Sequence, residues 1–261
     1  MPVTLEFDGE GTGSAARAVG VGEWSSVDSQ ALVDAGGEKL ELNRAKGFRG
    51  TSVDFLAELP QLRELKLIDL KIEDVAGVNA LPNLRRLTLS TYARTPIDFS
   101  NFALLEKCFF EWIRGSDSLF ECRTLRDLYI NRFPAESLEP LHRLNELHCL
   151  RLGNGAKASS VAGVERLAEL RELGLYRMPK VADWKPLSRA TELEVLEVET
   201  CKRLEAIDFL RPMRRLRELS LVNCGPIDSL APLADAEALE RFFFYESTNV
   251  RDGDLSGRDR G

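Results

Sequence analysis

The chain has 261 residues, of which 44% are apolar and 30% are charged, and its formal net charge is −7 at pH 7. Such a chain can bury a sizeable core, and its acidic balance argues against nucleic-acid binding because phosphates attract basic surfaces. No apolar run approaches the ~18 residues of a membrane-spanning helix, so no membrane partner is expected.

The first residues and the cysteines indicate the cellular compartment in which the chain is expected. Met1–Asp8 has neither the basic start nor the apolar core of a secretion signal. The five cysteines are odd in number and show no paired spacing, which favours a reducing environment over a disulfide framework. We therefore expect a cytoplasmic location.

Residues 1–37 carry no clear repeat. They contain an expected strand at Val3–Phe7, a stretch rich in Gly, Ala and Ser at Gly9–Gly22, and an expected short helix near Val27–Ala35. Because the end of a stacked array of repeats must be shielded from water, we assign residues 1–37 as an N-terminal cap.

Residues 38–248 repeat a Leu-x-x-Leu-x-Leu pattern. Its alternating apolar residues predict a short strand in each repeat. The middle apolar position recurs at steps of 20 to 23 residues, at Leu65, Leu87, Cys108, Leu128, Leu150, Leu173, Leu196, Leu219 and Phe242, with an imperfect earlier copy at Leu40. One such unit cannot bury its apolar face alone, so the repeats predict a stacked solenoid of about ten coils.

The segments between the strands show a different period. Apolar residues occur every third position, as in Ile72, Val75 and Val78, which predicts tight 3₁₀ turns rather than long α-helices. A Ser or Asp precedes the second apolar position in most repeats, and such side chains cap the free amides of a helical turn. These residues are Ser52, Asp74, Asp98, Ser118, Ser137, Ser160, Asp183 and Ser229.

The segments Val181–Leu187 and Ile227–Leu233 carry a resemblance to a known family. The chain resembles leucine-rich-repeat proteins, in particular the short 22–23-residue repeats of internalins and phosphatase-regulating proteins. The resemblance implies an α/β fold: a right-handed solenoid with a parallel sheet on the concave face and short 3₁₀ turns on the convex face. The family's usual Asn after the strand is missing here, with Leu70, Cys201 and Cys224 among the residues in its column. We therefore expect backbone, water or packing to satisfy those bends.

The C-terminal end closes the array. Phe242 and Phe244 should point into the core, and Phe243 and Tyr245 should be exposed unless the tail, a second copy or a partner covers them. We treat these last two residues as a possible secondary contact. Residues 249–261 are polar and rich in Gly, so we expect a disordered tail.

The outward-facing strand positions are the candidate binding surface. Phe109 and Tyr129 occupy one such column, with Trp112 and Arg132 three residues further along, and aromatic residues together with Arg are typical of interface hot spots. The alternative is that these aromatics fold inward in irregular coils. The predicted partner-binding residues are Phe109, Trp112, Tyr129, Arg132, Arg151, Tyr176 and Arg177.

The sequence contains no recognisable catalytic motif. Neither histidine, His142 or His148, has a nucleophile or a zinc ligand at a recognisable spacing, so we assign no catalytic residue, metal or cofactor. Cys149 falls on an outward-facing position and is the most plausible reactive thiol. Cys201 and Cys224 occupy equivalent positions in adjacent coils, where they could pair or could simply be buried thiols.

The sequence therefore favours a non-enzymatic module that binds a protein partner on its concave face, as a regulator, an effector or an immunity-type protein. The expected oligomeric state is a monomer or a weak dimer. Two alternatives stay open: a redox-sensing or enzymatic protein that uses Cys149 or the Cys201/Cys224 pair, and a self-assembling structural protein.

Overall fold

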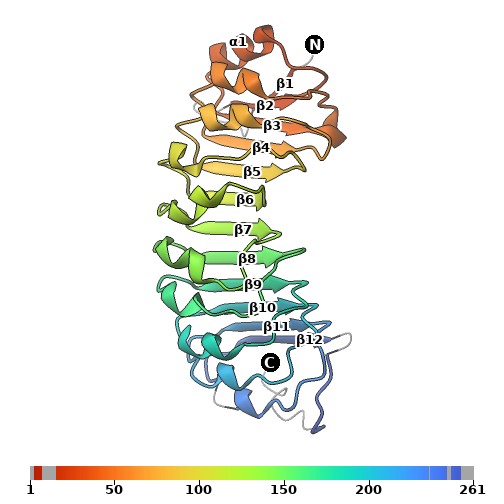
Figure 1. Ribbon diagram of the computed structural model, residues 1–261, viewed down its shortest axis with the longest axis vertical. Helices are drawn as coiled ribbons and strands as arrows, with labels where there is room; N and C mark the ends of the chain where they lie inside the picture. The colour runs from red at the N-terminus through yellow and green to blue at the C-terminus, as the bar shows by residue number, and fades with distance from the viewer. Residues whose placement is uncertain (1–2, 8–15, 235, 246–247, 254–261) are drawn as a thin grey trace. The chain divides into compact units, whose positions relative to one another are not determined.

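The computed structural model of the chain describes residues 3–7, 16–234, 236–245 and 248–253 (Figure 1). The chain divides into two compact units, residues 1–125 and 126–261, each of which is described by itself. Unit 1 contains β1 (Val3–Phe7), β2 (Ala16–Gly20), α1 (Ser26–Asp34), β3 (Lys39–Asn43), β4 (Glu64–Ile68), β5 (Arg86–Ser90) and β6 (Lys107–Glu111). Unit 2 contains β7 (Asp127–Asn131), β8 (Cys149–Gly153), β9 (Glu172–Tyr176), β10 (Val195–Glu199), β11 (Glu218–Val222) and β12 (Arg241–Tyr245).

Each unit is a stack of parallel strands in sequence order. In unit 1, β2 to β6 pair in parallel and β1 pairs antiparallel with β2. In unit 2, β7 to β12 pair in parallel. The register places repeat positions side by side, as with Leu40, Leu65 and Leu87 on β3, β4 and β5. The predicted strands and the leucine-rich-repeat solenoid fold are confirmed.

Short 3₁₀ helices connect the strands, as the period of three predicts. They are η1 (Arg44–Lys46), η2 (Asp54–Glu58), η3 (Ala76–Ala80), η4 (Phe99–Asn101), η5 (Asp117–Glu121), η6 (Glu139–Arg143), η7 (Val164–Arg166), η8 (Lys185–Arg189), η9 (Asp208–Leu210) and η10 (Ala231–Leu233). Several predicted caps are confirmed: Asp74 accepts a hydrogen bond from the amide of Ala76 at 2.9 Å, and Ser229 accepts one from that of Ala231 at 3.0 Å.

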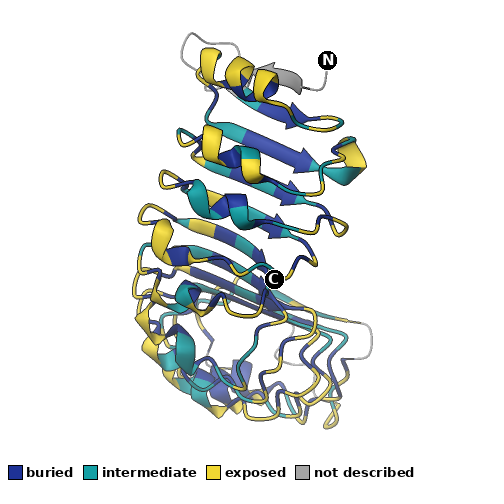
Figure 2. Cartoon of the chain, turned by 45° about the horizontal axis from the view of Figure 1, so that its top comes forward, coloured by how far each residue is buried: buried dark blue, intermediate teal, exposed yellow. Residues whose placement is uncertain are grey.

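The core of each unit lies between its strands and its 3₁₀ helices. Figure 2 shows buried residues along the strands and many exposed residues on the turns. Strand leucines such as Leu65 and Leu150 are fully buried, and so are turn residues such as Val78 and Leu187. Because full burial of a leucine contributes about 1.5–3 kcal/mol, the repeated apolar columns supply most of the favourable energy of the stack.

The bends after the strands are satisfied largely by the backbone. The amide of Arg177 donates to the carbonyl oxygen of Glu199 in the next coil at 2.8 Å, and that of Thr200 donates to Val222 at the same distance. The thiol groups of Cys201 and Cys224 approach carbonyl oxygens of the preceding coil, with Sγ 3.6 Å from the oxygen of Leu175 and 3.4 Å from that of Val198, respectively. Backbone and packing therefore replace the missing Asn column.

The N-terminal end contains the predicted helix. α1 begins after Ser25, which forms a capping box with Asp28: the amide of Ser25 donates to the Asp28 carboxylate at 2.8 Å. Leu32 is the fully buried residue of this helix. β2 already pairs in parallel with β3, so the stack of unit 1 begins inside the region assigned as a cap.

At the C-terminal end, one sequence-based expectation is wrong. Phe242 and Phe244 stack on each other at 5.3 Å but are only half-buried, because β12 is the last strand of unit 2 and has β11 as its strand neighbour. Val250, from the segment expected to be a tail, forms a parallel bridge with Ile227. The remainder of that segment, residues 254–261, lies outside the described residues.

Candidate functional site

In each unit, alternate strand residues point away from the core and form what we call the open face. In unit 2 the central row of this face is Tyr129, Arg151, Gly174, Glu197, Ser220 and Phe243, which the register of β7 to β12 aligns. Gly174 gives this row a position without a side chain. The missing side chain at Gly174 leaves room on the surface of the sheet in the middle of the open face.

The ring of Tyr176 occupies that space. Tyr176 stands two residues after Gly174 on β9, and a Cβ atom added at Gly174 would lie 2.5 Å from the Tyr176 hydroxyl oxygen. The hydroxyl donates a hydrogen bond to the Glu197 carboxylate on β10, and the Tyr176 and Tyr129 rings meet edge to face at 6.3 Å. A second glycine, Gly153, makes a similar approach: a Cβ atom added there would lie 2.8 Å from the Tyr129 hydroxyl oxygen. Two glycines thus allow both rings to lie against the sheet.

Arg151 stands between the two tyrosines and is held by acidic neighbours. Its guanidinium lies 2.9 Å from the Glu172 carboxylate and 3.6 Å from that of Asp127. It also donates to the sulfur of Cys149. Charge-assisted contacts on both sides fix the orientation of this side chain, so Arg151 is part of a preorganised surface.

Electrostatically, the open face of unit 2 is acidic. Its strand positions carry two basic residues, Arg151 and Arg241, and five acidic ones, which are Asp127, Glu172, Glu197, Glu199 and Glu218. Burial raises the pKa of the Tyr176 hydroxyl, and the hydrogen bond to Glu197 raises it further, so this hydroxyl stays protonated and keeps its role as a donor. The face therefore combines two fixed aromatic rings with an excess of carboxylates.

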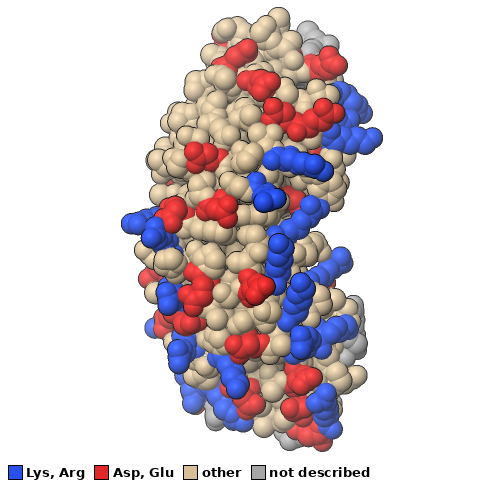
Figure 3. All heavy atoms as spheres, viewed as in Figure 1, with Lys and Arg blue, Asp and Glu red and all other residues tan. Residues whose placement is uncertain are grey.

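Arg132 and Arg177 lie at the ends of β7 and β9 rather than in the middle of the face. Both are exposed, and both adopt the left-handed backbone conformation, with φ of 57° and 53°. In Figure 3, Lys and Arg side chains line the right of the view, the side to which the strands point in Figure 1, and others lie on the left. Because they directly follow β7 and β9, these two arginines lie at the edge of the open face, beside its acidic and aromatic centre.

The predicted residues of unit 1 have other surroundings. Phe109 is a half-buried residue of the open face on β6, in register with Thr88. Trp112 follows β6 and is also half-buried, because its ring stacks on Phe120 at 5.4 Å and meets Phe110 edge to face at 5.9 Å. Phe109 and Trp112 belong to unit 1, whereas Tyr129 and Arg132 belong to unit 2. The surroundings of these predicted site residues are therefore described separately for each unit.

The expectation that Cys149 is an accessible, reactive thiol is wrong. Cys149 stands on an outward-facing strand position but is only 8% exposed, because the Arg151 guanidinium covers it. Burial, followed by the charge of Asp127, raises the pKa of the Cys149 thiol, whereas a reactive thiol needs a lowered one. Cys201 and Cys224 are buried free thiols, and burial raises the pKa of Cys201 to about 12. These environments disfavour thiol chemistry at either place.

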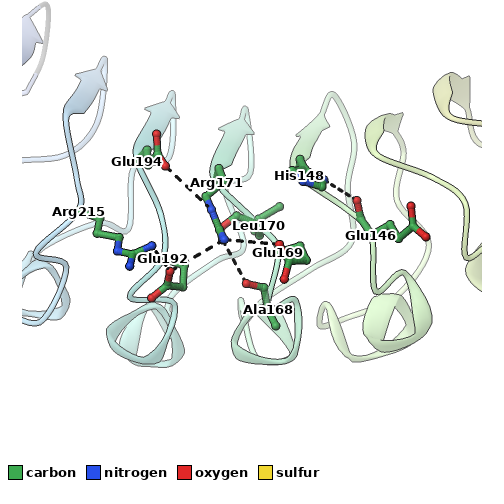
Figure 4. A network of polar contacts seen from close by, with 9 residues as sticks. All are labelled: Glu146, His148, Ala168, Glu169, Leu170, Arg171, Glu192, Glu194 and Arg215. Atoms are coloured by element: carbon green, nitrogen blue, oxygen red, sulfur yellow. Dashed lines mark hydrogen bonds and ion pairs between the residues drawn. The ribbon is translucent and has the colours of Figure 1, made fainter.

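Within the described residues, no group of three or more His, Cys, Asp or Glu side chains is placed to hold a metal ion. Both histidines are exposed and contact backbone carbonyl oxygens; Nδ1 of His148 lies 2.7 Å from the oxygen of Glu146. Figure 4 shows His148 beside a network in the turns before the strands, in which Arg171 contacts the backbone oxygens of Ala168 and Leu170 and the carboxylate of Glu169. These contacts connect turns of the stack. No helix in the described part of the chain has the length and apolarity to cross a bilayer.

Several residues of this face were not singled out from the sequence. They are Asp127, Gly153 and Gly174. The signal available was Gly174, the glycine in this outward-facing column, since a glycine inside a strand commonly marks a close approach of another group.

The repeated strand, bend and 3₁₀ helix define a leucine-rich-repeat protein, a class whose fold serves generally as a protein-interaction module. No protein-family model and no curated protein matches the sequence. Among solved structures, the fold is similar to an internalin, InlF, of Listeria monocytogenes, with a TM-score of 0.63 and 18% identity over 93% of this chain and 76% of that one.

Two further internalins of Listeria monocytogenes have similar folds. Internalin C2 matches with a TM-score of 0.54 and 18% identity, over 73% of this chain and 84% of its own. The functional domain of InlJ, described as including a cysteine ladder, matches with a TM-score of 0.54 and 17% identity, over 87% of this chain and 58% of its own. At these identities the similarity establishes an internalin-like leucine-rich-repeat fold.

Proposed function

We propose that the chain is a non-enzymatic protein that binds a protein partner on the open face of unit 2, in the cytoplasm. The observation that carries this proposal is the pair of tyrosines, Tyr129 and Tyr176, laid against the sheet over two glycines. Half-buried aromatic side chains that are already fixed lose little conformational entropy on binding, which is why they dominate many interfaces.

The surroundings of the two rings support the same proposal. Arg151 is oriented by Asp127 and Glu172, and Tyr176 is oriented by Glu197. The exposed Arg132 and Arg177 at the strand ends give the surface a polar, charged rim around an aromatic centre. This is the arrangement of hot spot and rim found in protein interfaces.

The test is capture of partners from the source organism by the immobilised wild type and by the double variant Tyr129→Ala/Tyr176→Ala. Each truncation of a hot-spot tyrosine costs about 2 kcal/mol or more, so the affinity for the partner should fall at least ~30-fold for each residue, and its recovery should fall accordingly. Tyr92→Ala is the matched control, since Tyr92 is an exposed tyrosine of unit 1. A partner that the double variant retains at full strength would exclude this face.

One observation favours a second candidate function, self-association through β12. Phe243 and Tyr245 are 46% and 54% exposed, and Phe242 and Phe244 on the same strand are half-buried. An exposed aromatic strand is a surface on which a second chain can pair. Light scattering of the wild type against Phe243→Ser/Tyr245→Ser tests it: a mass that stays monomeric at high concentration excludes self-association.

A further inference from the structure

Unit 1 contains a buried carboxylate surrounded by positive charges. Glu41, in the middle of β3, has no exposed surface although it stands on the open face. Arg17 on β2 forms an ion pair with its Oε2 atom, Lys46 Nζ lies 3.0 Å from the same oxygen, and Lys66 Nζ lies 3.7 Å from Oε1. Three side chains from three different segments thus converge on one carboxylate.

The charges of this cluster do not balance. Among the side chains that the structure describes here, one carboxylate faces three cations, which is an excess of two positive charges. Burial acts to raise the pKa of Glu41, but hydrogen bonds from Lys46 and Asn43 and the charge of Lys66 outweigh it, and the pKa is lowered; Glu41 is therefore ionised near neutral pH. The Arg17, Lys46 and Lys66 side chains stay partly exposed, at 29%, 47% and 38%. Their surplus charge is accessible from solvent.

Taken with the cluster, the strand positions of the open face of unit 1 carry a small excess of positive charge. The outward strand positions of β2 to β6 carry three acidic residues and five basic ones, the latter being Arg17, Lys39, Lys66, Arg86 and Lys107, and β1 adds Glu6 in register with Arg17. The whole chain is acidic, so a basic face here runs against the overall charge. Opposite charge on a partner would be favoured at this face and repelled by the acidic open face of unit 2.

We propose that the cluster of Arg17, Lys46 and Lys66 around Glu41 binds carboxylates of an acidic segment of a protein partner. The three cationic groups already surround one carboxylate, and Glu41 holds them together before binding, so a second carboxylate finds oriented donors. The half-buried Ile68, Thr88 and Phe109 on the neighbouring strands offer a surface for the rest of a peptide.

A polypeptide fits this face better than a nucleic acid. Glu64 and Glu111 also stand on the face, and Glu64 already contacts Arg86 at 3.1 Å. A continuous phosphate backbone would be repelled by these carboxylates, whereas a peptide with separated acidic residues can avoid them. The proposal concerns unit 1 and extends the proposed function without depending on the face of unit 2.

The test uses a labelled oligo-glutamate peptide of about eight residues, which is long enough to cross five strands spaced ~4.8 Å apart. Binding is measured by fluorescence anisotropy for the full chain at low salt. We expect Lys66→Ala and Arg17→Ala each to weaken binding about fivefold, the loss of one partly exposed ion pair. Lys71→Ala is the matched control, because Lys71 is an exposed lysine in the bend after β4.

The outcomes separate this proposal from its rivals. Weaker peptide binding by Lys66→Ala and Arg17→Ala, together with unchanged peptide binding by Lys71→Ala, supports the proposal. The proposal is overturned if the peptide does not bind, if Lys71→Ala weakens binding as much, or if an oligo-lysine peptide binds as well. Displacement of the peptide by a single-stranded oligonucleotide of equal charge would also overturn it, in favour of phosphate binding.

Discussion

The hydroxyl group of Tyr176 on β9 donates a hydrogen bond to the carboxylate of Glu197 on β10, with the Tyr176 ring lying over Gly174. Gly174 is in register with Glu197, so the absence of a side chain on β9 is what lets the tyrosine reach the next strand. The position of the Tyr176 ring on the open face of unit 2 therefore depends on Gly174.

Replacement of that glycine should disturb the face without unfolding unit 2. In Gly174→Ala, the new methyl group would meet the hydroxyl end of Tyr176, which can swing away at a stability cost of about 1 kcal/mol, including the lost hydrogen bond. We expect partner capture to fall as far as in Tyr176→Ala, with a urea midpoint close to that of the wild type. Unchanged capture would show that the orientation of Tyr176 is irrelevant. Ser220→Ala, two strands away in the same row, is the control.

The thiol groups should be unreactive in the folded chain. All five cysteines are buried, and burial raises the pKa values of Cys122, Cys149, Cys201 and Cys224. Titration with a thiol-specific disulfide reagent should label none of them until denaturant is added. Arg151→Ala removes the group that covers Cys149, so in this variant one thiol should become accessible to the reagent. Rapid labelling of the native wild type would restore the redox hypothesis.

The contribution of Glu41 should depend on pH in a defined direction. Its folded-state pKa is lowered from the ordinary value of 4.5, so its stabilisation is complete above that value and is lost as the pH falls through the folded-state pKa. Glu41→Gln should lower the free energy of unfolding by roughly 1–3 kcal/mol at about pH 7 and by much less at about pH 3. Denaturant titrations of both proteins measure the difference. A difference independent of pH would contradict the ionic role of Glu41.

Close packing of adjacent coils should make Gly77 intolerant of any side chain. A Cβ atom at Gly77, in η3, would lie 2.0 Å from the carbonyl oxygen of Val53 in the preceding coil. Backbone cannot move aside cheaply, so we expect Gly77→Ala to lower the free energy of unfolding by about 2–4 kcal/mol. Gly36→Ala is the control: Gly36 has φ of 64° but open space around it, so its cost should stay near 1 kcal/mol. Thermal unfolding of the two variants compares them directly, and equal costs would argue against tight contact at Gly77.

The sequence by itself determined the repeated architecture. Leu65 and Leu150 lie within strands because the Leu-x-x-Leu-x-Leu pattern alternates inward and outward residues, and Val75 and Val78 lie on a tight turn because their period is three. Caps such as Asp74 follow from side-chain chemistry that acts over two residues. The strand alternation, the turn period and the caps each depend on residues close together in the sequence, so they can be predicted from the sequence.

Only the tertiary structure decided what happens on the open faces. Arg151 covers Cys149, and the Tyr176 hydroxyl donates a hydrogen bond to Glu197. The Glu41 carboxylate is buried by Arg17, Lys46 and Lys66. A residue at an outward-facing strand position is not necessarily exposed to solvent, because long side chains from neighbouring positions can lie across the sheet and cover it. Arg17 reaches Glu41, and Tyr176 reaches Glu197, from more than 20 residues away. These contacts depend on register and rotamer, and they exist only once the coils are stacked.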